Sequence, residues 1–273
     1  MGGRNININL EQWVNDQLSK GKFSFSLDTL RKAFPEQTAV AIKSSLLRLV
    51  AKGNILSIHK GYYLIIPPQY KSKGILPPVL YLDALMKELK RPYYLALLNA
   101  AAYHGASHQQ PQEFFVVTGF PVLRPTIKKG LKINYISKNE IPTALLEKQK
   151  TEAGYVNIAN PILTATDLVQ YAKRVGGITR VAELLNELGE EIKPTDFIAE
   201  LIEYVPVSVL QRLGYLLDKI LHNDSLANAL EKMIQQKEIT LFRTPLKASA
   251  SIKGMPVDER WSVIVNTQIE LNE

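Results

Sequence analysis

Residues 38–67 read TAVAIKSSLLRLVAKGNILSIHKGYYLIIP, and this stretch decides the fold of the N-terminal part of the chain. Its first half predicts an amphipathic helix over residues 38–53, because apolar residues recur at helical spacing. The apolar side of this helix is predicted to consist of Ala39, Ile42, Leu46, Leu49 and Val50. Gly53 ends the helix, as glycine commonly does. Two β-rich runs, residues 55–58 and 62–66, around the short tip His59-Lys60-Gly61 then predict a hairpin.

The opposite side of the predicted helix is small, polar and basic, and it has no carboxylate. Small side chains let a helix enter a DNA major groove, where Gln, Ser and Arg bond to base edges and methyl groups touch thymine. We therefore expect base readout by Gln37, Thr38, Ala41, Ser44, Ser45 and Arg48. Lysines that flank this helix or sit at the hairpin tip are expected to contact phosphates: Lys32, Lys43, Lys52 and Lys60.

The residues before position 38 extend this pattern. Helical spacing predicts a helix over residues 9–19, residues 23–25 alternate like a strand, and Ser26 is suited to cap a helix over residues 27–34. The order helix, strand, helix, helix, hairpin is typical of a winged helix-turn-helix, in which the last helix reads DNA. The alternative is an ordinary amphipathic helix that packs on a hairpin.

The positive charge is confined to this N-terminal segment. Residues 1–75 contain 11 Lys or Arg and 4 Asp or Glu, which accounts for the whole net charge of +7. The remaining residues contain 22 of each and are neutral. Such a local excess is the electrostatic pattern of a nucleic-acid-binding module.

The composition excludes several other classes of protein. The absence of cysteine excludes disulfides, zinc–thiolate sites and cysteine nucleophiles. No apolar run reaches about 18 residues, and the N-terminus has no apolar signal core. We therefore expect a cytoplasmic protein without a membrane partner.

A stretch rich in Pro, Gly and Lys at residues 67–78 predicts a domain boundary near position 75. The expected fold is α+β, with a winged helix-turn-helix over residues 1–75 and a helix-rich mixed α/β domain over residues 76–273. In the second domain, strands are predicted over residues 113–118, 131–136 and 261–270. Helices are predicted there over residues 79–89, 93–103, 164–173, 178–188, 195–205 and 207–221.

No motif for nucleotide, nucleophile or metal chemistry occurs in the chain. His104 and His108 have the i, i+4 spacing of a metal pair, but Gly105 interrupts the helix between them, so no metal site is expected. A nuclease site built from Asp83, Glu113 and Lys132 is conceivable, yet nothing in their spacing requires it. We therefore expect a non-enzymatic protein without catalytic residues or cofactor.

A second basic cluster lies within residues 124–132, between two predicted strands, and has no acidic residue. Its members are Arg124, Lys128, Lys129 and Lys132. A single-sign cluster attracts anions, which favours a contact with nucleic acid or with a toxin's substrate. The alternative is a solvated loop.

Four motifs together indicate a family. They are LLRLVAKG at 46–53, YYLALLNAAAYHGA at 93–106, NPILTATDL at 160–168 before Gly176 and Gly177, and the Trp261 segment with Asn266. With these motifs the chain resembles the AbiEi-type antitoxins of bacterial type IV toxin–antitoxin and phage abortive-infection systems. Asn160 departs from the family pattern, which more often has an acidic residue there, and no role is assigned to it.

The resemblance implies a two-domain autorepressor and antitoxin. Its N-terminal domain would bind double-stranded DNA at inverted repeats in its own promoter. Its C-terminal domain would antagonise a nucleotidyltransferase toxin without forming a stable complex. Two alternatives remain open: a DNA-processing enzyme targeted by a winged helix, and a repressor that senses a ligand in a pocket closed by Tyr93, Tyr94 and Tyr103.

Overall fold

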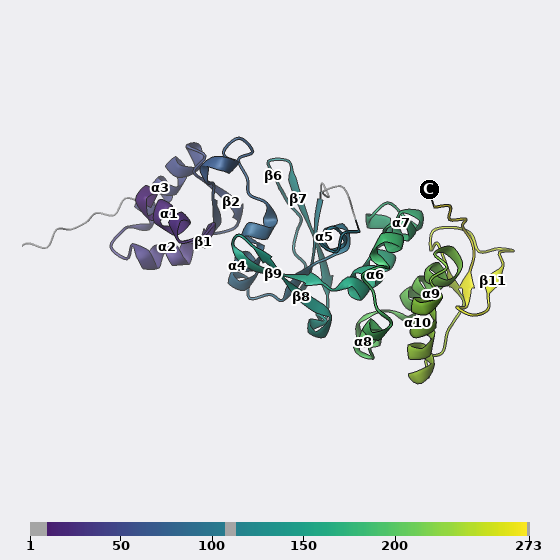
Figure 1. Ribbon diagram of the computed structural model, residues 1–273. Helices are drawn as coiled ribbons and strands as arrows, with labels where there is room; N and C mark the ends of the chain where they lie inside the picture. Colours follow the sequence, from purple (N-terminus) through teal and green to yellow (C-terminus); the bar gives the residue numbers. More distant parts are fainter. Residues whose placement is uncertain (1–9, 107–112, 272–273) are drawn as a thin grey trace, which may run out of the picture.

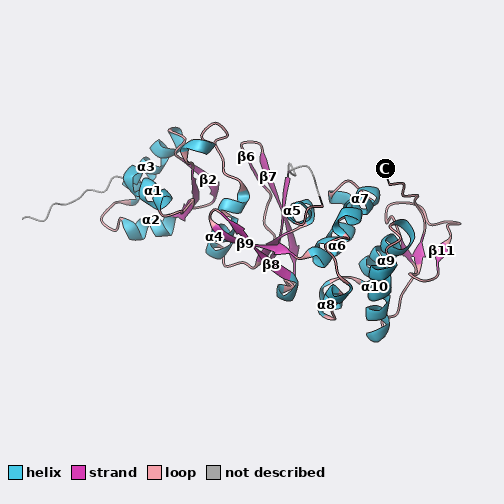
Figure 2. Ribbon diagram, viewed as in Figure 1, coloured by secondary structure: helices cyan, strands magenta, loops and turns pink. Residues whose placement is uncertain are grey.

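The protein is elongated, and its layers follow one another in chain order (Figure 1). The computed structural model describes residues 10–106 and 113–271. Helices and a small sheet form the N-terminal end, a larger sheet occupies the middle, and helices followed by short strands form the C-terminal end (Figure 2). The fold is therefore mixed α+β, as predicted. Within the described ranges, no helix has the length and apolar character needed to cross a bilayer.

The N-terminal part follows the predicted order of elements. Its helices are α1 (Leu10–Ser19), α2 (Leu27–Ala33) and α3 (Ala39–Ala51), and its strands are β1 (Ser24–Ser26), β2 (Ile55–His59) and β3 (Tyr62–Ile65). The strands form an antiparallel sheet in the order β1-β3-β2. Ser26 caps α2 as predicted, because its Oγ accepts a hydrogen bond from the Thr29 backbone N–H at 3.2 Å.

The three helices and one face of the hairpin enclose a small apolar core. Leu30 of α2 lies at its centre and is fully buried. The Trp13 ring meets the Phe25 ring edge-on, with centroids 5.2 Å apart, and Phe25 stacks on Tyr63. This core holds α3 against the hairpin, so the position of α3 is fixed by residues from all the surrounding elements.

The other face of the hairpin is buried against the next part of the chain. Ile58, Tyr62 and Leu64 share a second core with α4 (Leu82–Glu88) and with the inner strands of the large sheet. Ile75 and Leu76 are themselves buried in it. Residues on both sides of position 75 therefore pack into one core, at the place where the sequence predicts a boundary.

The large sheet has six strands in the order β6-β7-β5-β4-β9-β8. They are β4 (Tyr93–Leu95), β5 (Glu113–Gly119), β6 (Thr126–Lys128), β7 (Leu131–Lys138), β8 (Leu146–Thr151) and β9 (Gly154–Ala159). The pairs β5–β7 and β4–β9 are parallel, and the other pairs are antiparallel. The strands predicted over residues 113–118 and 131–136 are confirmed as β5 and β7.

The helix predicted over residues 93–103 is wrong in its first part. Tyr93, Tyr94 and Leu95 form β4, a central strand, and α5 (Leu97–Tyr103) begins after it. Leu97 has a left-handed backbone with φ of 53°, which a continuous helix does not allow. All residues of β4 are buried. A strand covered on both faces has an unbroken apolar sequence, which fits a helix equally well.

Helices surround the largest core. They are α5, α6 (Pro161–Gln170), α7 (Ile178–Leu188), α8 (Glu200–Tyr204), α9 (Val207–Tyr215) and α10 (Asp224–Gln236). The prediction for residues 178–188 is confirmed, and residues 207–221 form α9 followed by a π-helical turn. The helix predicted over residues 195–205 is reduced to α8. The predicted terminal strand over residues 261–270 is reduced to β12 (Val263–Ile264), which pairs with β10 (Thr244–Pro245) and β11 (Val257–Asp258).

A buried ion pair joins the sheet to the helices. Asp167 of α6 is fully buried and accepts hydrogen bonds from Lys138 Nζ at 2.8 Å and from the Tyr94 hydroxyl at 2.9 Å. Burial raises the pKa of Asp167, and the Lys138 ammonium opposes that rise. Because the groups come from α6, β7 and β4, they fix the helical layer relative to the sheet.

Trp261 closes the C-terminal core. Its indole Nε1 donates to Asp218 at 2.9 Å, and its ring lies against α9 at Gly214. A Cβ at position 214 would lie 2.1 Å from that ring, so only glycine fits there. Arg260 pairs with both Asp218 and Glu231, at 3.1 and 2.8 Å. Trp261 and Arg260 thus attach the last strands to the helices.

Candidate nucleic-acid interface

The exposed side of α3 differs from the predicted one. On the predicted apolar side, Ile42, Leu46 and Leu49 are buried, whereas Ala39 is exposed and Val50 is 38% exposed. The core contacts only a narrow stripe of this helix. The exposed side consequently includes two large apolar side chains that the sequence reasoning missed: Val40 and Leu47.

The residues predicted to read bases are distributed over the exposed side and its edges. Ala41, Ser44 and Arg48 are exposed on α3. Thr38 is the N-cap of the helix, because its hydroxyl accepts from the Ala41 backbone N–H at 3.2 Å. Gln37 is partly buried in the turn before that cap. Ser45, also partly buried, accepts a hydrogen bond from Arg48 Nη2 at 3.0 Å, so these two side chains form one unit.

The lysines predicted to contact phosphates have different surroundings. Lys32, Lys43 and Lys60 are exposed and have no ion pair within the described residues. Lys52 instead pairs with Glu11 of α1 at 2.9 Å, and its ammonium holds the pKa of that carboxyl below the usual value. DNA would have to compete with Glu11 for Lys52.

The hairpin tip is short and lies against α2. Only Lys60 and Gly61 separate β2 from β3, and the Gly61 carbonyl accepts from the Leu27 backbone N–H at 2.7 Å. Gly61 has φ of 72°, a left-handed conformation suited to this tight turn. Lys60 therefore projects from a rigid turn rather than from a long mobile wing.

The second basic cluster is a β-hairpin with one paired lysine. Arg124, Lys128 and Lys129 are exposed, in the segment before β6, on β6 and in the turn that follows it, respectively. Lys132 pairs with Glu113 at 2.8 Å, because β7 lies beside β5 with these two residues in register. The prediction of four cations without an acid is therefore wrong for Lys132. Hydrogen bonds from Lys132 and Asn134 lower the pKa of Glu113.

This second cluster lies beside the N-terminal hairpin. Arg124 and Lys128 line a groove of about 530 Å³ together with Ile58 and His59 of β2. At the turn, the Lys129 stem lies 3.8 Å from the position a Cβ would take at Gly74. Cations of the central sheet thus border the N-terminal unit, although the sequence places them in a separate domain.

The carboxylates considered for a nuclease site do not converge. Asp83 accepts from the Tyr93 hydroxyl at 3.0 Å, and Tyr93 pairs with Thr118 at the end of β5 opposite Glu113. Thr118 lies five positions after Glu113 along the strand, which is about 17 Å. No group of three potential metal ligands occurs among the described residues. His104 bonds to the Ala159 carbonyl at 2.8 Å, and His108 lies outside the described ranges.

The three tyrosines proposed to close a ligand pocket are used otherwise. Tyr93 and Tyr94 are buried, and their hydroxyls donate to Asp83 and Asp167. Burial accordingly raises the pKa of the Tyr94 hydroxyl. Tyr103 is 40% exposed on α5. These rings therefore belong to the core and its edge, as aromatic residues at helical spacing more often do, and they do not support the alternative of a pocket that the three tyrosines close.

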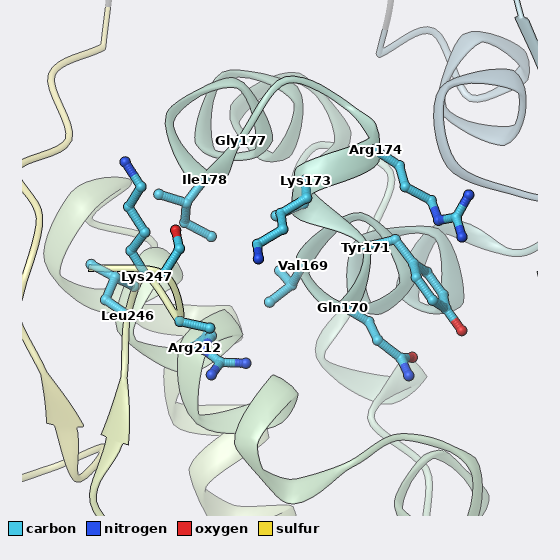
Figure 3. Close-up of a pocket in the computed structure, with 13 residues that line it drawn as sticks. Val169, Gln170, Tyr171, Lys173, Arg174, Gly177, Ile178, Arg212, Leu246 and Lys247 are labelled. Carbon is cyan, nitrogen blue, oxygen red and sulfur yellow. The ribbon is translucent and has the colours of Figure 1, made fainter. Parts of the chain in front are cut away.

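A different pocket lies between α6, the start of α7 and residues 246–249, and Figure 3 shows it. We call it the four-cation pocket after its basic residues: Lys173, Arg174, Arg212 and Lys247. Sequence reasoning missed it, because these residues come from three distant segments. The sequence marks this place only by Gly176-Gly177, which lies between two predicted helices. Asn160 also has a role that was not predicted: its side chain caps α6 by accepting from the Leu163 backbone N–H at 3.0 Å.

Comparisons with known proteins agree with the family motifs. Residues 94–219 match the family described as AbiEi antitoxin C-terminal domain. No curated protein matches the sequence. A crystal structure of the RV2827C protein from Mycobacterium tuberculosis is similar, with a TM-score of 0.65 over 96% of this chain and 92% of that one. At 17% identity, this likeness shows a shared fold. The match over residues 94–219, together with the motifs that surround it, supports an AbiEi-type antitoxin.

Proposed function

We propose that this antitoxin is also a DNA-binding autorepressor of a type IV toxin–antitoxin system in the cytoplasm. Residues 10–66 act as a winged helix-turn-helix that binds inverted repeats in the promoter of its own operon. The C-terminal part counters a nucleotidyltransferase toxin, without a stable complex between the two proteins. Neither activity requires catalysis by this chain.

The observation that carries the DNA-binding proposal is the exposed side of α3. Ala41, Ser44 and Arg48 lie there without any neighbouring carboxylate on the helix. Val40 and Leu47 add methyl groups that suit contacts with thymine. The exposed lysines Lys32, Lys43 and Lys60 supply charge beside this surface for phosphate contacts.

The test is binding of the full chain to its own promoter, measured by fluorescence anisotropy with a scrambled duplex as comparison. Arg48→Ala should weaken operator binding by roughly 1–3 kcal/mol if Arg48 bonds a guanine edge. Lys237→Ala, an exposed lysine after α10, is the matched control and should change nothing. Equal loss on both duplexes would make Arg48 a phosphate contact. No preference for the operator by the parent protein would contradict the proposal.

The antitoxin part is tested separately, in cells that express the toxin encoded beside this chain. Co-expression of the full chain should restore growth, while affinity purification of either protein should not recover the other. A stable complex in that purification would contradict the proposed mode of action. Rescue by a variant that no longer binds DNA would show that the two activities are independent.

A ligand-sensing repressor is the second candidate, and the four-cation pocket is the observation that favours it. In that case, occupation of the pocket would change operator affinity. A titration of the protein–operator complex with candidate anions distinguishes the two functions, because the antitoxin proposal alone requires no such response.

A further inference from the structure

Two cations face each other across the four-cation pocket. The pocket has a volume of about 310 Å³. Lys173, which follows α6, and Arg212, on α9, both point into it, whereas Tyr171 and Arg174 point away (Figure 3). Like charges in a partly enclosed space repel each other, and an anion between them removes that repulsion.

No acidic side chain of the described structure neutralises these cations. The pocket lining contains no Asp or Glu, and no ion pair within residues 10–106 and 113–271 involves Lys173, Arg212 or Lys247. Arg212 is anchored by one hydrogen bond, from Nε to the Pro245 carbonyl at 2.8 Å. That bond orients the guanidinium and leaves its two terminal nitrogens available. Burial lowers the pKa of Arg212, as expected where a cation lacks a counter-charge.

The N-terminus of α7 adds further positive potential. Gly177 is its N-cap and lines the pocket with Ile178, and no side chain caps the helix. The first backbone N–H groups of a helix have no partner within the helix, and its dipole is positive at this end. Gly176 and Gly177 have φ values of 104° and 100°, which a side chain would strain. This turn brings the backbone to the pocket beside Lys173.

The remaining walls are apolar. Val169, Ile178 and Leu246 line the pocket, and Ile178 and Leu246 are buried. An inorganic anion would leave these walls without a partner. The volume also exceeds that of one phosphate group and falls near the lower end of small-molecule sites, which is about 300 Å³. The walls therefore suit a ligand that joins an anionic group to an apolar one.

We propose that the four-cation pocket binds a nucleoside phosphate. Its phosphate lies between Lys173 and Arg212 at the N-terminus of α7, and its base packs against Val169, Ile178 and Leu246. This inference does not depend on the proposed DNA binding, since the pocket is built entirely from residues 169–249.

Isothermal titration of the full chain with ATP and with GTP, without metal ions and at low salt, tests the proposal. At least one nucleotide should bind at a single saturable site. Lys173→Gln and Arg212→Gln should each weaken binding about tenfold or more, the effect of one lost charge-assisted contact. Lys232→Gln removes an exposed charge from α10, outside the pocket, and should leave binding unchanged.

Comparison ligands show whether the pocket recognises both the phosphate and the nucleoside part of the nucleotide. Pyrophosphate and adenosine should each bind at least about tenfold more weakly than the nucleotide, because each lacks one of the two groups. Pyrophosphate binding as tightly as ATP and GTP would overturn the nucleoside assignment. A 5′-phosphorylated single strand binding more tightly than both nucleotides would assign the site to a nucleic-acid end instead.

A loss of nucleotide binding is informative only in a variant that is still folded. Lys173 is exposed, so Lys173→Gln should melt like the parent protein even if Arg212→Gln, which loses the bond to Pro245, does not. Undetectable binding of both nucleotides, or unchanged binding by folded Lys173→Gln, would overturn the proposal.

Discussion

The exposed side of α3 and the four-cation pocket are both positively charged, but they are built in different ways. On α3, the residues lie on one helix, and the surrounding segment carries the whole net charge of the protein. The pocket assembles its cations from residues 173–174, 212 and 247, in a part of the chain with no net charge. Counting charge along a sequence therefore finds surfaces formed by one segment and misses those that tertiary packing creates.

The two regions also depend on different cores. The α3 surface rests on the small N-terminal core, and the hairpin next to it is shared with the second core. The pocket rests on the largest core, through α9, which carries both Arg212 and Gly214. A change in one core should consequently affect one region and leave the other in place, unless the second core couples them.

The largest expected effect comes from separating the chain at position 75. The sequence favours residues 1–75 as an independent unit. A fragment of these residues, however, exposes Ile58, Tyr62 and Leu64, which are buried in the whole chain. We predict that it loses its cooperative thermal transition, measured by circular dichroism. A cooperative transition together with operator binding like that of the full chain would show that the α3 surface needs only its own core.

The next effect in size concerns Gly214. Gly214→Ala places a methyl group into the Trp261 ring, so we expect a loss of stability of about 3 kcal/mol, at the upper end of overpacking effects. Nucleotide binding should fall with it, because Arg212 lies on the same helix, while operator binding should persist. Urea denaturation and the two binding assays measure these outcomes.

A double variant provides the control for Gly214. Trp261→Phe shortens the ring that the new methyl group meets, so the combined variant should lose less stability than the sum of the single losses. Strict additivity would contradict the steric explanation. Loss of operator binding by folded Gly214→Ala would break the separation between the two regions.

A smaller effect is expected from the second basic cluster. We predict that Glu at positions 124, 128 and 129 reduces either operator affinity or rescue from the toxin, since Arg124, Lys128 and Lys129 are exposed. Lys132 is kept, because it pairs with Glu113. Exposed substitutions typically change stability by about 0.5 kcal/mol or less each. If melting, DNA binding and rescue all match the parent protein, the cluster is a solvated hairpin.

The smallest effect is on the pH dependence of stability. Burial opposes ionisation of Asp218, but its bonds to Trp261, Lys219 and Arg260 prevail and lower its pKa. A lowered pKa stabilises the fold above the unfolded value near 3.8, and this contribution is lost as pH falls through the folded value. Asp218→Asn should flatten the fall in urea midpoint between neutral and acid pH. An equally steep fall in the variant would contradict this role.

Local chemistry explains which parts of the fold were predictable. Ser26 and Gly53 mark helix ends through their own backbone and side-chain preferences, and residues 178–188 carry a clear helical period. In contrast, β4 is a strand only because β5 and β9 flank it, and Lys132 is neutralised only because β5 brings Glu113 beside it. Strand register and side-chain partners of this kind are properties of the assembled sheet.

The candidate sites were likewise predictable where one local segment forms them, and not where the assembled fold does. Arg48 and Ser44 were found because one helical period decides which side of α3 is exposed, and the missed exposure of Val40 and Leu47 reflects how narrow the contact with the core is. Arg212 gave no signal, because its approach to Lys173 depends on how α9 packs beside the end of α6.

The buried ion pair between Asp167 and Lys138 restricts how this protein can evolve. Removing one partner of a buried pair leaves an uncompensated charge and destabilises a fold by about 3–5 kcal/mol, whereas replacing both by apolar residues is often tolerated. Tyr94 would lose its acceptor whenever Asp167 is replaced. Substitution of one of these residues at a time is therefore disfavoured. Related sequences should either retain Asp167, Lys138 and Tyr94 or have replaced them together.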